Sequence, residues 1–195
     1  MSTSGPTKAG PATGPRTTTS TTFPKGESTT AATQKPKKPK KAATSAAVPT
    51  RETVGSYTLY NVFTGFCVDL DGTGPAGDDA QLFQNVCLPG KGDNQDFELD
   101  AYGDQFVIRN ISSNRCIDGP GFGDISPNAS ATVYTCRPGF LDNQMFTKVK
   151  KGGGYFLKNV KGGLCLNVAD NDHLTAQKLT YLACSTTDDH IWALR

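Results

Sequence analysis

The sequence lacks any long apolar run. No stretch of about 18 or more apolar residues occurs in it, so no membrane-spanning helix is predicted. Met1 is followed by Ser-Thr-Ser-Gly-Pro rather than by an apolar segment, so no signal peptide is predicted from the visible start.

Residues suited to catalysis are also scarce. Residues 51–195 contain two His and two Glu, and no Gly-x-Ser-x-Gly motif accompanies them, so no Ser-His-Asp triad is predicted. The many Asp residues leave a two-carboxylate glycosidase open, but most of them lie in predicted turns, where they serve local roles. We therefore predict that this chain is not an enzyme.

The six cysteines are not spaced for metal binding. Zinc sites use cysteines roughly two to four residues apart, whereas these lie at least 19 residues apart, so neither a metal site nor a cofactor is predicted. Their regular separation of 19 or 20 residues within three pairs suggests disulfides and an oxidising compartment. Six reduced thiols in a cytosolic protein are the alternative. The pairs are Cys67/Cys87, Cys116/Cys136 and Cys165/Cys184.

The first 50 residues differ in composition from the rest. They contain 18 Ser or Thr, seven Pro and a single aromatic residue, so they cannot bury enough apolar surface to offset the entropy of ordering. We predict a disordered linker over residues 1–51. Eight basic residues and one acidic residue give residues 1–50 a charge of +7, whereas residues 51–195 carry 12 basic and 17 acidic residues, or −5.

The remaining residues form three copies of one module. The first cysteines of the three pairs are separated by 49 residues and then by 49 again. Self-similarity at such a period indicates a repeat architecture. Further positions share this register, namely Tyr57, Phe106 and Tyr155; Leu59, Ile108 and Leu157; Asn61, Asn110 and Asn159; Asp69, Asp118 and Asn167.

Each copy shows short runs that alternate apolar and polar residues, which is the period of a half-buried strand. Gly, Asn and Asp separate these runs and suit tight turns, and no segment shows a helical period. We predict an all-β fold, closed with threefold symmetry because one copy could not bury its apolar face alone. Asn61, Asn110 and Asn159 are predicted to bind turn backbone, and Phe97, Phe146 and Trp192 to pack in the core.

The residues around the cysteines resemble those of one family. The segments Cys-Val-Asp-Leu at 67–70, Cys-Ile-Asp-Gly at 116–119 and Cys-Leu-Asn-Val at 165–168 are each followed by a second cysteine. Asn94-Gln95-Asp96-Phe97 and Asn143-Gln144-Met145-Phe146 then close the first two copies, and Asp189-His190-Ile191-Trp192 closes the third.

This pattern resembles the ricin B-chain type β-trefoil lectins over residues 53–195. The resemblance implies a β-trefoil domain over residues 52–195, with repeats at 53–102, 103–151 and 152–195 and one disulfide in each repeat. It also implies up to three shallow sugar sites, one per repeat.

The resemblance implies which residues bind the sugar. Each site uses the acidic residue two after the first cysteine, a residue four before the second cysteine, an aromatic residue two before it, and the Asn of the closing Asn-Gln pair. A carboxylate and an amide bind vicinal hydroxyls, while an aromatic face packs on the apolar side of a sugar ring. The second repeat is the most complete, with Asp118, Thr132, Tyr134, Asn143 and Gln144.

The other two repeats depart from this pattern. The first keeps Asp69, Asn94 and Gln95 but has Phe83 four before Cys87 and Asn85 at the aromatic position, so its stacking surface is an open question. The third has Asn167, Leu182 and Asp189-His190 instead, and we expect it to be a structural copy in which His190 stabilises a turn.

We therefore predict a carbohydrate-binding, lectin-like module for galactose-type or related sugars. The partners expected are glycans or polysaccharide, not a specific nucleic acid. The domain is expected to be monomeric and to have an extracellular or cell-surface location. An anchor or catalytic domain is expected upstream.

Two alternatives stay open. One is a trefoil scaffold that contacts a protein, and the other is a polyanion binder that acts through the basic run at residues 35–41, although a solvated spacer is the favoured interpretation of that run.

Overall fold

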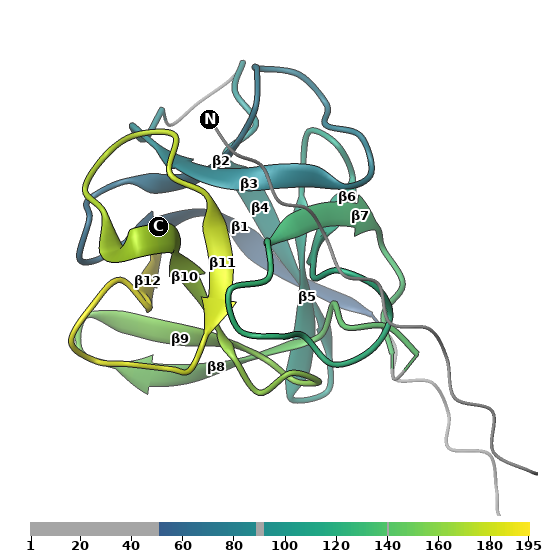
Figure 1. Ribbon diagram of the computed structural model, residues 1–195. Helices are drawn as coiled ribbons and strands as arrows, with labels where there is room; N and C mark the ends of the chain where they lie inside the picture. The colour runs from purple at the N-terminus through teal and green to yellow at the C-terminus, as the bar shows by residue number, and fades with distance from the viewer. Residues whose placement is uncertain (1–50, 89–91, 140) are drawn as a thin grey trace, which may run out of the picture. The chain divides into compact units, whose positions relative to one another are not determined.

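The computed structural model describes residues 51–88, 92–139 and 141–195 (Figure 1). The predicted linker lies outside these residues, except for Arg51. The first copy contributes the strands β1 (Glu52–Asn61), β2 (Cys67–Leu70), β3 (Ala80–Asn85) and β4 (Asp96–Tyr102). The second contributes β5 (Gln105–Asn110), β6 (Arg115–Asp118), β7 (Thr132–Thr135) and β8 (Phe146–Lys151). The third contributes β9 (Gly154–Asn159), β10 (Cys165–Val168), β11 (Leu179–Leu182) and β12 (Ile191–Leu194).

Six of these strands close into a barrel. Antiparallel pairing runs from β1 to β4, β5, β8, β9 and β12 and returns from β12 to β1. The other six strands form the hairpins β2–β3, β6–β7 and β10–β11, one in each copy (Figure 1). Among the described residues the helical structure is limited to a short 3₁₀ turn at Ala169–Asn171. The fold is therefore a β-trefoil, as predicted.

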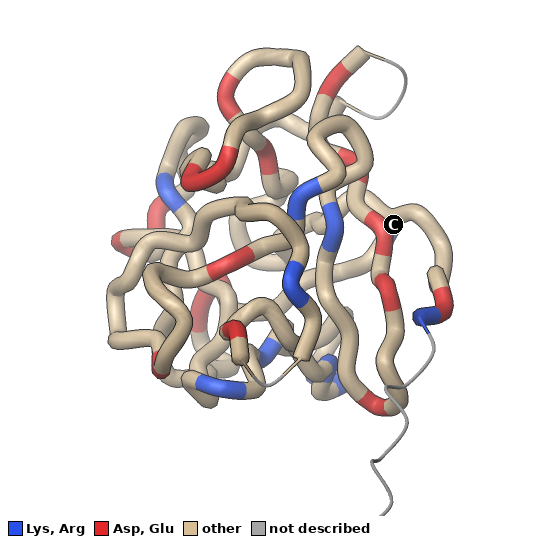
Figure 2. The backbone as a smooth tube through the Cα atoms, turned by 90° about the vertical axis from the view of Figure 1, so that its right-hand side faces the viewer, with Lys and Arg blue, Asp and Glu red and all other residues tan. Residues whose placement is uncertain are grey.

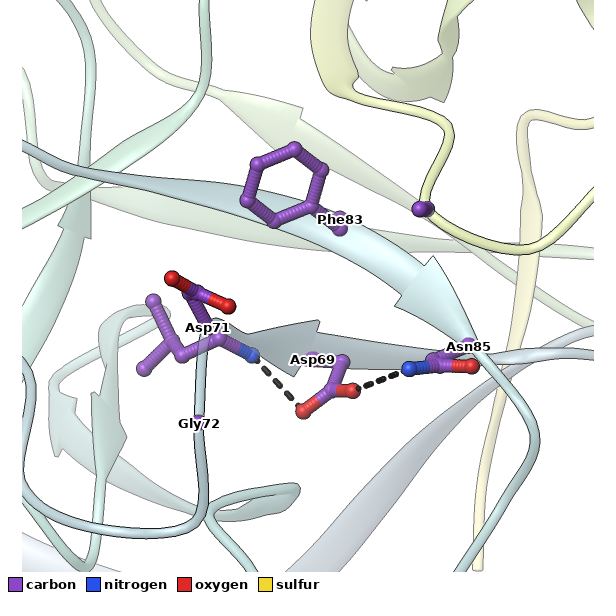
Figure 3. A pocket seen from close by; sticks show the side chains of 7 residues that line it. Asp69, Asp71, Gly72, Phe83 and Asn85 are labelled. Carbon is purple, nitrogen blue, oxygen red and sulfur yellow. Dashed lines mark hydrogen bonds between the residues drawn. The ribbon is translucent and has the colours of Figure 1, made fainter.

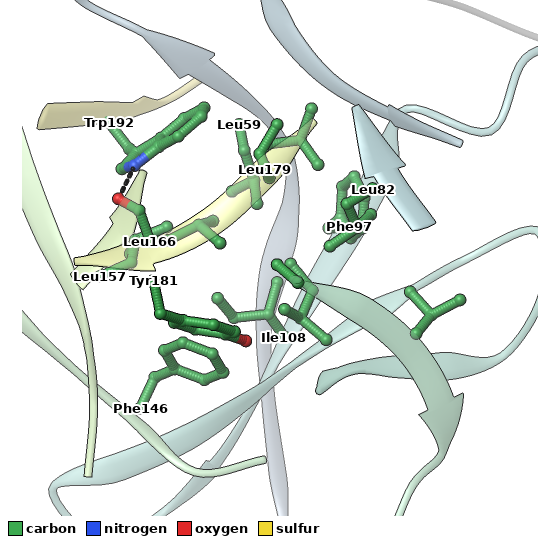
Figure 4. Packing of buried hydrophobic residues seen from close by; sticks show 14 of the residues in the cluster. Leu59, Leu82, Phe97, Ile108, Phe146, Leu157, Leu166, Leu179, Tyr181 and Trp192 are labelled. Atoms are coloured by element: carbon green, nitrogen blue, oxygen red, sulfur yellow. Dashed lines mark hydrogen bonds between the residues drawn. The ribbon is translucent and has the colours of Figure 1, made fainter. Parts of the chain in front are cut away.

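The core lies inside the barrel and beneath the hairpins. Equivalent positions of the three copies meet there, including Phe97, Phe146 and Trp192, whose predicted core packing is confirmed because all three are fully buried. Figure 4 shows Trp192 donating its indole N–H to the Leu166 carbonyl, at 3.0 Å. Burial of each Leu, Ile or Phe side chain contributes roughly 1.5–3 kcal/mol, so this shared core explains why the three copies fold together.

The three predicted disulfides are confirmed. Each joins the first strand of a hairpin to the segment just after the second strand, with sequence separations of 20, 20 and 19 residues. Closing a loop of this length contributes roughly 3 kcal/mol by restricting the unfolded chain. The disulfides therefore stabilise the hairpins that carry the predicted sugar sites.

Three asparagines link the copies in a ring. Asn61 Nδ2 donates to the Asp189 carbonyl and Asn110 Nδ2 to the Asn94 carbonyl, each at 2.6 Å, and Asn159 Nδ2 donates to the Asn143 carbonyl. The Oδ1 atom of each also accepts backbone N–H groups of its own turn. The predicted structural role is confirmed, and it includes a contact between copies that the sequence did not indicate.

Charged residues are interspersed along the described chain, as Figure 2 shows. One carboxylate, Asp100, is buried and accepts hydrogen bonds from Arg109 Nε at 2.8 Å and Thr53 Oγ1 at 2.9 Å. Burial alone would raise the pKa of Asp100, but Arg109 and Thr53 hold it below its ordinary value.

No helix among the described residues is long and apolar enough to span a membrane.

Candidate functional site

The three hairpins present equivalent positions on one face. Asp69 lies opposite Phe83, Asp118 opposite Thr132, and Asn167 opposite Thr180 in the strand registers. Directly opposed residues of an antiparallel pair point to the same side. Each hairpin therefore places the residue two after its first cysteine beside the residue four before its second cysteine.

The first hairpin carries a small pocket of about 170 Å³, which is below the roughly 300 Å³ at which pockets for drug-sized ligands begin. It therefore suits one small polar ligand. Figure 3 shows the Asp69 and Asn85 side chains pointing toward each other, joined by a hydrogen bond. The lining residues are Asp69, Leu70, Asp71, Gly72, Phe83, Asn85 and Ala176.

Asp69 is held in place by the strand pair around it. One carboxylate oxygen accepts the Leu70 backbone N–H at 2.8 Å, and the other accepts Asn85 Nδ2 at 2.9 Å. Asn85 therefore orients the carboxylate from the position at which an aromatic residue was expected. The aromatic surface of this pocket comes from Phe83 instead. The first repeat therefore has an aromatic ring in its pocket although the expected aromatic position is held by Asn85.

The closing pair of the first repeat, Asn94 and Gln95, holds the loops around the pocket. Asn94 is buried, and its Nδ2 donates to the carbonyls of Gly72 and Gly74 at 3.1 and 3.2 Å. Gln95 is also buried and holds the segment after β3 through Val86 and Leu88 backbone groups, at 2.9 Å each. Both predicted site residues thus shape the loops that frame the pocket, and neither lines it.

Asp118 of the second repeat lies in a more buried setting. Its side chain accepts the Gly119 backbone N–H at 2.9 Å. Burial, reinforced by the nearby Asp142 carboxylate, raises the pKa of Asp118 to about 7, although Gln144 and the Gly119 N–H partly oppose this rise. Near neutral pH this side chain therefore exchanges between an acceptor-only carboxylate and a carboxylic acid that can also donate.

Asn143 and Gln144 repeat the arrangement of the first copy. Asn143 Nδ2 donates to the carbonyls of Gly121 and Gly123, both at 3.2 Å, and Gln144 Oε1 accepts the Arg137 backbone N–H at 2.7 Å. Both side chains are fully buried. They hold the loops on either side of the hairpin, between which the half-buried Thr132 and Tyr134 side chains of β7 lie.

The third hairpin uses its polar groups internally. Asn167 Nδ2 donates to the Val168 carbonyl at 2.7 Å and to Thr180 Oγ1 at 3.1 Å. His190 is buried and its Nδ1 contacts the Asp188 carboxylate, which agrees with the predicted role in a turn. These contacts support the expectation that the third repeat is a structural copy.

Asp188, Asp189 and His190 each place one potential metal-ligand atom within 4.8 Å of the others. The Asp189 side chain is fully buried, and burial raises its pKa to about 6, opposed by His190 and assisted by Asp188.

Six residues near the first two sites were not predicted. Leu70, Asp71, Gly72 and Ala176 line the first pocket. In the second repeat Arg137 lies over the rings of Phe122 and Tyr134. Phe122 carried a recognisable signal, because it is an aromatic residue between two turn glycines. Ala176 comes from the third repeat and carried none.

The fold and the paired polar and aromatic side chains of its hairpins define a β-trefoil of the sugar-binding class. Residues 55–192 match the ricin-type beta-trefoil lectin domain, and the chain belongs to this family. Membership supports carbohydrate binding in general and indicates a binding role rather than a catalytic one. A search of curated proteins found no significant match.

Solved structures share the fold at low sequence identity. The designed 3-fold symmetric protein ThreeFoil is 23% identical, with a TM-score of 0.64 over 71% of this chain and 96% of its own. The Rhizoctonia solani agglutinin is 18% identical, with a TM-score of 0.61 over 78% of this chain and 98% of its own. An exo-beta-1,3-galactanase from Clostridium thermocellum is 22% identical, with a TM-score of 0.62, and the match covers 71% of this chain but only 29% of the galactanase.

Proposed function

We propose that this chain is a carbohydrate-binding module that recognises galactose-type or related sugars at the hairpins of its first and second repeats. The observation that carries the proposal is the first pocket, where the Asp69 carboxylate and the Phe83 ring line the same small cavity. A carboxylate can accept two hydroxyl hydrogens of a sugar, and an aromatic ring can cover the apolar face of the sugar ring.

The second repeat supports the same function with a different set of groups. Asp118 and Thr132 lie opposite each other on one hairpin face, and Tyr134 follows two residues along the same strand and therefore on the same face. Asn143 and Gln144 are buried and fix the surrounding loops. This arrangement provides an acceptor and an aromatic ring on a rigid support, which reduces the entropy lost on binding.

We further propose that the module brings an attached protein to glycans outside the cell. The galactanase match covers a minor part of that enzyme, which is how a module joined to a catalytic domain would match. Three disulfides and the lectin family are consistent with an extracellular location. Single shallow sites bind weakly, so several sites or an attached partner would supply useful avidity.

A glycan array tests the proposal. The full oxidised chain is applied beside variants Asp69→Asn and Asp118→Asn, which remove a carboxylate charge but keep an oxygen acceptor. Asn167 occupies the equivalent position of the third repeat, so this exchange is compatible with the fold. Thermal unfolding of each variant is measured in parallel to show that it is folded.

Binding of galactose-containing glycans that weakens in both variants supports sugar sites in both repeats. Weakening in one variant alone assigns binding to that repeat. Strong binding that neither substitution changes would place the sugar elsewhere and overturn the proposed sites. A blank array would overturn carbohydrate binding and leave the trefoil as a scaffold for protein contacts.

A further inference from the structure

We propose that the second-repeat site selects glycans that carry an anionic substituent, with Arg137 as the residue that determines this preference. The inference rests on the proposed sugar-binding function and names the class of sugar. It is carried by three exposed or half-exposed side chains, Phe122, Tyr134 and Arg137, that meet at the edge of this site.

Arg137 lies against two aromatic rings. The centre of its guanidinium group is 5.4 Å from the centroid of the Phe122 ring and 5.2 Å from that of the Tyr134 ring, within the range of cation–π attraction. Its backbone N–H donates to the buried Gln144 side chain at 2.7 Å. The rings and this anchor hold the guanidinium beside Tyr134, the ring assigned to sugar stacking.

The loop that presents Phe122 is fixed at several points. Asn143 holds the carbonyls of Gly121 and Gly123 on either side of Phe122, and the Phe122 carbonyl itself accepts a hydrogen bond from Lys161 Nζ. The Phe122 ring is nevertheless 57% exposed. An exposed ring on a fixed backbone is available for contact with a ligand or with Arg137.

The core also anchors this loop. Gly119 occupies the position at which the other repeats have Leu70 and Val168, both buried. Ile125, from the same loop, fills the vacant space, since a Cβ atom on Gly119 would lie 2.6 Å from Ile125 Cδ1. Ile125 therefore ties this loop to the core.

The N–H groups of the Arg137 guanidinium are available to bind a ligand. Among the described residues, no carboxylate forms an ion pair with Arg137, and no hydrogen bond engages its side chain. Arg115 of the same repeat is instead engaged by Asp78, at 2.7 Å. A planar guanidinium with free N–H groups binds a carboxylate or sulfate in a two-point contact, and stacking on aromatic rings leaves its edge available for this.

The first repeat provides an internal comparison. The positions equivalent to Phe122, Tyr134 and Arg137 are held there by Thr73, Asn85 and Leu88. The first repeat thus lacks all three features. We infer that the first pocket takes a neutral sugar and that the second site takes a sugar bearing a carboxylate or a sulfate ester.

Matched pairs of immobilised glycans test the inference. The full oxidised chain is applied to neutral galactosides, to the corresponding galacturonides and to galactose 6-sulfates, so that the two sources of negative charge are read separately. The variants are Arg137→Leu, which copies the first repeat, and Arg115→Leu as the control. Both variants keep the basic residues 1–50, so a difference between them cannot come from that segment.

We expect the unmodified chain to bind at least one acidic member of a pair about tenfold more tightly than its neutral partner. Arg137→Leu should abolish this preference and keep neutral binding, whereas Arg115→Leu should keep both. Salt should weaken binding of the acidic glycans more than of the neutral ones.

Equal binding of acidic and neutral partners, or a preference that survives Arg137→Leu, would overturn this inference and leave the proposed sugar binding in place. Absence of binding to every glycan would overturn both.

Discussion

Asn110 of the second repeat donates a 2.6 Å hydrogen bond from its side chain to the main-chain carbonyl of Asn94 in the first repeat. Asn110 is fully buried, and its Oδ1 also accepts the backbone N–H and hydroxyl of Ser113. One side chain thus closes a turn in its own repeat and connects that turn to the preceding repeat. Equivalent bonds at Asn61 and Asn159 complete the ring.

Substitution Asn110→Ala should lower the free energy of unfolding by about 2–3 kcal/mol, because it leaves a buried carbonyl and a turn N–H without partners. Urea unfolding followed by fluorescence measures this loss. Ile111→Ala serves as the control, because the Ile111 side chain is exposed. Equal losses for the two variants would mean that the asparagine bonds add little.

Asp118 should make stability depend on pH. Its folded-state pKa of about 7 exceeds the ordinary value of 3.8, so between these values the folded state holds a proton that the unfolded state has released. The contribution of Asp118 therefore becomes less favourable as pH rises from about 4 to about 7 and is constant above that range.

The variant Asp118→Asn isolates this effect, because it cannot ionise. We expect its advantage in unfolding free energy over the unmodified chain to be greater at pH 8 than at pH 5, as measured by urea unfolding at both values. The lowered pKa of Asp100 has the opposite sign and acts below about pH 4, outside this range. A constant difference between the two proteins across pH would contradict the raised pKa.

Removal of the second disulfide by Cys116→Ala with Cys136→Ala should lower the free energy of unfolding by about 3 kcal/mol. It should also weaken binding at the second repeat, because Tyr134 lies in the enclosed segment two residues before Cys136. Removal of the Cys165–Cys184 disulfide is the matched control. That change should cost a similar stability and leave glycan binding at the second repeat intact.

Phe83→Thr should weaken sugar binding at the first repeat by up to about tenfold, because an aromatic contact contributes on the order of 1 kcal/mol. Threonine occurs at the equivalent positions 132 and 180, so the fold should accept it. Titration with galactose in a Tyr134→Ala background, which removes the ring of the second repeat, measures the effect. Val86→Ala, at an exposed side chain outside the pocket, should leave the affinity unchanged.

Much of the fold followed from sequence because its signals are local and occur three times. The 49-residue step, the alternating strands and the paired cysteines each appear in every copy, and one copy alone could not bury its apolar face. Asp69 and Asp118 share the same register, and the family resemblance marked both as site residues. These features depend on spacing along the chain, which the sequence states directly.

The composition of the sites depended on tertiary packing. Phe83 could be recognised in the sequence, but its place in a pocket with Ala176 of the third repeat required two repeats to be brought together. The contact of Arg137 with Phe122 likewise joins two loops that Asn143 and Ile125 hold in place. The sequence by itself thus determined the trefoil and its repeated register, whereas packing between loops decided which side chains share each site, because those contacts join residues with no regular spacing.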